Sequence, residues 1–108
     1  MKIGDIILIP FPFAELTNRK VRPAVVITET DDKYRDLVVS AISSVVPSSI
    51  SHREIIIRPD RINNLRSTSV IKVDRIVTLK REDKIAELGK LSNNELLEFK
   101  NILSEIIR

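Results

Sequence analysis

The fold is decided by residues 22–43, RPAVVITETDDKYRDLVVSAIS, in which two short apolar runs flank a polar segment. Residues 24–28 and 37–43 are rich in valine, and side chains branched at Cβ pack well on a pleated sheet. Asp31-Asp32, between the two runs, is typical of a turn. This stretch therefore predicts two strands separated by a turn.

Further apolar runs of the same kind lie on both sides of this stretch, at residues 3–9, 54–57, 70–73 and 76–79. Proline lacks the amide donor that a central strand needs, so prolines are expected at strand ends. Pro10 and Pro12 follow the first run, Pro23 opens the second strand, and Pro47 and Pro59 follow later runs. Short strands of this kind suit a small barrel or a highly curved sheet.

The hydrophobic period changes near the C-terminus. From Ser92 onward, Leu96, Phe99 and Ile102 recur at helical spacing. Ser92 and Glu95 form a capping-box pattern, because each side chain can bond a backbone amide of the other residue. Residues 84–91 permit either a helical turn or a short strand. The sequence therefore predicts a single domain over residues 1–108, mainly β within the α+β class, with a C-terminal amphipathic helix.

Composition excludes several function classes. The chain has 43% hydrophobic and 31% charged residues and a formal charge of +3, which suits a globular protein and mildly favours an anionic partner. It has no cysteine, so disulfides and thiolate zinc sites are excluded. The apolar start is interrupted by Asp5 and two prolines, so we expect neither a signal peptide nor a membrane partner, and a cytoplasmic location.

The sequence offers little for metal or cofactor chemistry. Its one histidine, His52, cannot form a two-histidine acid/base pair, and no acidic or histidine residues have the spacing of a zinc site. His52 is interpreted as a surface loop residue, with a proton carrier as the alternative. No glycine-rich phosphate loop is present. We therefore expect no cofactor.

Two polar positions next to predicted strands suggest phosphoryl chemistry. Arg22 lies at the mouth of a strand, where its guanidinium can bind a phosphate through two parallel hydrogen bonds. Ser43, followed by Ser44, ends the run 37–43 and can donate a hydroxyl hydrogen bond. Each position also has a purely structural interpretation, as a solvated basic turn or as a turn-forming serine.

Five blocks of the sequence, in order, resemble the MazF/PemK family. They are residues 4–13 (GDIILIPFPF), 22–27 (RPAVVI), 39–44 (VSAISS), 69–79 (SVIKVDRIVTL) and 88–92 (LGKLS). The resemblance implies an SH3-like barrel of the type shared by CcdB and PemK, in which 84–91 contain a final strand. It also implies a metal-independent endoribonuclease toxin that cuts single-stranded RNA, forms a homodimer and is blocked by a cognate antitoxin.

The same resemblance implies that Arg22 and Ser43 are catalytic, with Ser43 at a position where the family has threonine. Serine keeps the hydroxyl but lacks the methyl that stiffens χ1, so activity is expected to be lower. The reaction is attack of the RNA 2′-hydroxyl on the adjacent phosphate. No general base is assigned, because arginine stays protonated.

Substrate contacts are expected from the segment before Arg22 and from two further positions. The predicted contact residues are Phe13, Thr17, Asn18, Arg19, Lys20, Ser44 and Arg75. Phe13 has an alternative role as core filler, and Arg75 as an exposed strand charge. Two other functions stay open: a gyrase poison of the CcdB type that only binds its target, and a family member that binds RNA or antitoxin without cutting.

Overall fold

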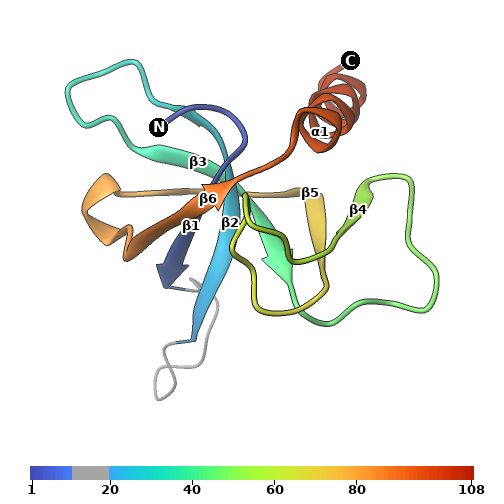
Figure 1. Ribbon diagram of the computed structural model, residues 1–108. Coiled ribbons are helices and arrows are strands. Elements are labelled where there is room, and N and C mark those ends of the chain that lie inside the picture. Colours follow the sequence, from blue (N-terminus) through green and yellow to red (C-terminus); the bar gives the residue numbers. More distant parts are fainter. Residues whose placement is uncertain (11–19) are drawn as a thin grey trace.

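The computed structural model describes residues 1–10 and 20–108, and in this part of the chain six strands form one antiparallel sheet followed by a helix (Figure 1). The sheet order is β4-β5-β3-β2-β1-β6, which leaves β4 and β6 at its edges. The sheet curls into a half-barrel, which confirms the predicted fold class. The strands are β1 (Asp5–Pro10), β2 (Val21–Glu29), β3 (Leu37–Ser43), β4 (Glu54–Ile57), β5 (Ser69–Leu79) and β6 (Ala86–Lys90).

Strand β5 joins two runs that the sequence presents as separate strands. Its pairing with β3 jumps from Ala41↔Lys72 to Ser40↔Ile76, so residues 73–75 form a bulge that bends the strand. The fully buried Ser40 hydroxyl donates a 2.8 Å hydrogen bond to the carbonyl of Val73, within this bulge. A polar side chain on the partner strand thus satisfies a carbonyl in the irregular part of β5.

The predicted opening of the second strand at Pro23 is wrong by two residues, because β2 begins at Val21. Pro23 pairs with Leu8 of β1, whereas the pairing with β3 starts only at Ala24. The proline therefore lies beyond the described β2–β3 pairing, where its missing amide costs no bond to β3.

The ambiguous residues 84–91 form β6, as the family resemblance implies, after the short 3-10 helix η1 (Arg81–Asp83). Lys90 donates a backbone hydrogen bond of 3.1 Å to the carbonyl of Ile62. Gly89 lies against the same carbonyl, and a Cβ atom at this position would overlap it. Glycine is thus required by the close approach of a loop between β4 and β5.

Both faces of the sheet are buried, and α1 (Asn93–Ile106) covers one of them. Phe99 and Ile102 of α1 pack with one core cluster, which includes Ile6, while the neighbouring Ile7 belongs to the cluster on the other face. The predicted capping box of Ser92 and Glu95 is confirmed at the start of α1. In the described part of the chain, no helix is long and apolar enough to cross a membrane.

Candidate functional site

Arg22 and Ser43 lie on neighbouring antiparallel strands. The β2–β3 pairing includes Val25↔Ser40 and ends at Ala24↔Ala41, and this register continued by two residues would set Arg22 opposite Ser43. Residues opposite one another share a face of the sheet, with Cβ atoms roughly 5 Å apart. Both residues are half-buried, and β2 begins at the end of the molecule opposite α1 (Figure 1). The continued register would set a guanidinium and a hydroxyl on one face near this end.

The Ser43 hydroxyl has a local structural partner. Its Oγ accepts a 3.1 Å hydrogen bond from the backbone N–H of Val45, which supports the turn that follows β3. A serine hydroxyl accepts through its lone pairs and donates through its own proton. The turn-forming and phosphate-binding interpretations are therefore compatible, because the first uses only the acceptor side.

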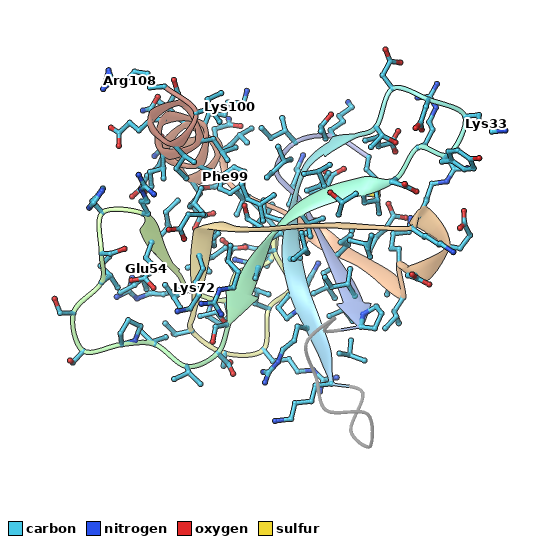
Figure 2. All side chains as sticks on the ribbon, turned by 180° about the vertical axis from the view of Figure 1, so that it is seen from behind. Lys33, Glu54, Lys72, Phe99, Lys100 and Arg108 are labelled. Carbon is cyan, nitrogen blue, oxygen red and sulfur yellow. The ribbon has the colours of Figure 1, made fainter. Side chains whose placement is uncertain are left out.

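Lys72 of β5 is a second cation on the same face as Ser43, and the sequence did not identify it as a site residue. Lys72 of β5 pairs with Ala41, two residues before Ser43, and also with Glu54 of β4. The Lys72 Nζ lies 3.4 Å from Glu54 Oε2, and Figure 2 shows the two side chains next to one another. A hydrogen bond from the Ser51 backbone amide and the nearby Lys72 ammonium hold the pKa of Glu54 below its ordinary value of 4.5. The sequence signal was a lysine inside the apolar run 70–73.

A cavity of about 350 Å³ borders Arg22. It lies between the ends of β1 and β2 and the loop of residues 58–68. Ser44 lines this cavity and Ser43 does not. Within residues 1–10 and 20–108, no aspartate or glutamate lines the cavity. Its residues are Leu8, Val21, Arg22, Pro23, Ser44, Asn64, Leu65, Arg66, Ser67, Ser69 and Leu88.

The loop 58–68 is held by its own polar side chains. The buried Asn63 Oδ1 accepts from the backbone amides of Asp60 and Leu65, at 3.0 and 2.9 Å, and its Nδ2 donates to the Arg58 carbonyl. Asn64, in a left-handed conformation with φ 55°, donates a 2.6 Å hydrogen bond to the Leu88 carbonyl of β6. The wall of the cavity is therefore fixed to the sheet.

The other predicted contact residues are distributed as follows. Phe13, Thr17, Asn18 and Arg19 lie outside the described residues. Lys20 is exposed directly before β2 and does not line the cavity. Arg75 is exposed in the β5 bulge and borders a separate shallow cavity formed by residues 74–77.

A metal site of this kind needs three or more histidine, aspartate or glutamate side chains close together. The part of the chain that the structure covers contains no such cluster. His52 is exposed in the β3–β4 loop and does not line the cavity beside Arg22. The polar residues near Arg22 are instead hydroxyl, amide and cationic groups.

The family model of the PemK-like, MazF-like toxins of type II toxin–antitoxin systems matches residues 2–107. The chain belongs to this family. The family model therefore covers the whole sheet and α1, and confirms the family that the sequence blocks suggest. A search of the curated proteins found no match.

Solved structures of MazF proteins share the fold of this PemK-like chain. The toxin MazF-mt6 of Mycobacterium tuberculosis superposes with a TM-score of 0.70 at 19% identity, covering 95% of both chains. MazF from Deinococcus radiodurans gives a TM-score of 0.70 at 17% identity, covering 99% of this chain and 96% of the other. A mycobacterial endoribonuclease in complex with its cognate antitoxin gives a TM-score of 0.70 at 12% identity, covering 99% of this chain and 94% of the other.

Proposed function

We propose that this protein is the toxin endoribonuclease of a type II toxin–antitoxin pair and cuts single-stranded RNA without a metal ion. Membership of the PemK-like, MazF-like toxin family supports the toxin role, and one structural neighbour is an endoribonuclease bound to its antitoxin. The main support for catalysis is the β2–β3 register, in which Arg22 falls opposite Ser43 when the pairing is continued. A guanidinium and a hydroxyl so arranged suit a phosphodiester.

The proposed reaction needs no nucleophile from the protein. The RNA 2′-hydroxyl gives up its proton, its oxygen attacks the adjacent phosphorus, and the bond from phosphorus to the 5′ oxygen breaks. The products are a 2′,3′-cyclic phosphate and a 5′-hydroxyl that has taken up a proton. The enzyme then contributes alignment and stabilisation of negative charge on the phosphoryl oxygens.

Arg22 would neutralise that charge, and Ser43 would donate a hydrogen bond from the proton that its turn contact leaves available. Lys72 adds positive charge on the same face, and its ion pair with Glu54 limits the positions of its flexible side chain. Ser43 lacks the χ1-stiffening methyl of threonine, so Ser43→Thr is expected to retain or raise activity.

The proposal is tested with purified protein and a long unstructured RNA in EDTA, followed by mapping of the new ends. We expect cyclic phosphate and 5′-hydroxyl ends from the wild-type protein. Because Arg22 is assigned to neutralise the negative charge that develops on the phosphoryl oxygens, Arg22→Ala is expected to lower the cleavage rate by roughly 10²- to 10³-fold. Ser43→Ala should lower it more than Ser104→Ala, a change of an exposed serine on α1 that serves as its matched control.

Intact RNA under these conditions would contradict the nuclease, and stalling of DNA gyrase by the same preparation would instead support a binding toxin of the CcdB type. RNA binding without cleavage would support a family member that has lost catalysis. Growth arrest on expression does not separate the nuclease from a gyrase poison, because both activities would produce it.

The same proposal includes a cytoplasmic homodimer and an antitoxin that covers the basic surface near Arg22. An acidic, partly disordered antitoxin segment would complement the net charge of +3. Light scattering of the purified chain tests the dimer, since a monomer mass would contradict it. Release of nuclease activity by proteolysis of a co-purified partner tests the antitoxin.

A further inference from the structure

We infer that the loop 58–68 is a phosphate-binding surface outside the proposed cleavage site, and that it binds the backbone of RNA that extends beyond the cut. This inference rests on the proposed function and deepens it by naming a contact with the flanking part of the substrate. The loop carries Arg58, Arg61 and Arg66 but a single acid, Asp60, so its net charge is +2, against +3 for the whole chain. Most of the net positive charge thus lies in one short loop.

The three arginines of the loop are available to a ligand. All three are exposed, and none of them forms an ion pair with the residues that the structure describes. The one acid is engaged by the backbone of the loop, because Asp60 Oδ1 accepts hydrogen bonds of 2.8 and 2.7 Å from the amides of Ile62 and Asn63. A guanidinium can bind a phosphate through two parallel hydrogen bonds. The loop therefore presents three such groups to solvent.

A single buried side chain, that of Asn63, draws together the backbone that carries the arginines. Its Oδ1 accepts from the amides of Asp60 and Leu65, and its Nδ2 donates to the carbonyl of Arg58. Two nitrogens at 3.0 and 2.9 Å from one oxygen lie no more than about 6 Å apart, and the residue after each of them is an arginine. The arginines are thus held on a compact, preordered loop, so little ordering cost remains on binding.

The exposed surface of the loop suits a phosphate backbone better than a protein partner. Besides the arginines it includes Asn64, Ser67 and Thr68. Arginine, asparagine, serine and threonine are among the side chains that contact nucleic-acid phosphates. Protein interfaces are centred on apolar or aromatic anchors, and the only large exposed hydrophobic side chain of this loop is Ile62. We therefore assign the loop to RNA.

The loop lies on the other side of the sheet from the Arg22 side chain. The pairing Ile9↔Arg22 sets Arg22 on one face. The neighbouring pair Leu8↔Pro23 belongs to the opposite face and lines a cavity together with residues 64–67 of the loop. RNA bound at Arg22 can therefore meet the loop only through nucleotides beyond the scissile phosphate. The loop should contribute to the binding of long substrates and not to the chemical step.

The test is the salt dependence of binding to a labelled RNA of about 24 nucleotides, 2′-O-methylated throughout so that it cannot be cut. The combined variant Arg58→Ala, Arg61→Ala and Arg66→Ala removes three phosphate contacts. The slope of log affinity against log salt should therefore become shallower by about 2. Between about 50 and 200 mM salt, the affinity of this variant should drop roughly 20-fold less than that of the wild-type protein.

The control combines Lys33→Ala, Lys100→Ala and Arg108→Ala, which remove the same charge from the hairpin between β2 and β3 and from α1 (Figure 2). It should keep the wild-type slope. An equal loss of slope in both triple variants overturns the inference, because only the total charge would then matter. A polyglutamate peptide that loses binding in the arginine variant, with RNA binding unchanged, would assign the loop to an acidic protein partner instead.

Cleavage of an unmethylated RNA of the same sequence separates this inference from the proposed function. The triple arginine variant should raise KM and leave kcat unchanged, because the loop binds substrate and transition state equally well. Arg22→Ala should instead lower kcat, and a similar fall in the triple variant would overturn the placement of the loop outside the cleavage site. If the wild-type protein cuts no RNA but the slopes differ as expected, the nuclease is lost and the phosphate-binding surface stands.

Discussion

The helix α1 and the loop 58–68 are both well held, but by interactions of different range. The capping box of α1 joins Ser92 and Glu95, three positions apart, and its apolar stripe repeats within the helix. The loop combines local bonds of Asn63 with contacts to β6, such as the bond from Asn64 to Leu88, which lies 24 positions away. The comparison teaches that the local sequence specifies the start of the helix, whereas the attachment of the cavity wall to the sheet is specified by residues distant in the chain.

The largest effect on stability is expected from Phe99→Ala, which tests whether local interactions such as the capping box are enough to stabilise α1 without packing on the sheet. Phe99 is fully buried between α1 and the sheet, so its loss should lower the free energy of unfolding by about 3–5 kcal/mol. The exposed Leu97→Ala is the matched control and should change it by less than about 0.5 kcal/mol. Urea unfolding followed by circular dichroism measures both, and similar midpoints would show that tertiary packing matters little to α1.

A smaller effect is expected from Asn63→Ala in the loop. This change removes three side-chain hydrogen bonds and leaves the buried Leu65 amide without its acceptor, which should cost about 1–3 kcal/mol. Amide exchange should accelerate at Leu65 first, because its N–H loses its acceptor. Asn101→Ala, on the exposed side of α1, is the control. Unchanged exchange in the loop would mean that contacts with β6 hold it without Asn63.

The smallest of these effects is expected from Ser92→Ala, which removes the local cap of α1. Loss of the bond from the Glu95 amide to the Ser92 hydroxyl should cost about 1 kcal/mol. Ser104→Ala, within the same helix, should be neutral or stabilising, since alanine is the better helix former. Thermal unfolding of the two variants compares them directly. A cost at Ser92 equal to that at Phe99 would remove the distinction between local and long-range support.

The sequence was sufficient to predict an element where a local pattern is compatible with only one structure. The strands β3 and β4 and the Ser92 capping box follow directly from short apolar runs rich in valine and isoleucine and from cap chemistry. Residue type made Arg22 and Ser43 candidates for phosphate binding, and the family resemblance then implied their catalytic roles. Their catalytic roles stay a prediction that the RNA cleavage assay tests.

The sequence was not sufficient where partners come from elsewhere in the chain. Asn64 looks like an ordinary turn residue, and only the folded chain reveals that it lines the cavity and bonds to Leu88 of β6. Lys72 looks like an exposed strand charge until β4 sets Glu54 beside it. The break in the apolar pattern at Asp74 suggested two strands, because a bulge in β5 is recognisable only from its pairing with β3.

That bulge also determines where this chain tolerates a change of length. Residues 73–75 face no partner on β3, so one residue inserted after Asp74 would lengthen the irregular segment and leave the pairing on both sides intact. An insertion between Ile71 and Lys72 would instead turn the lysine and its neighbours to the opposite face. Relatives that differ in length within this strand are therefore expected to differ at the bulge, where evolution can add or remove a residue without disturbing Lys72 or Ser43.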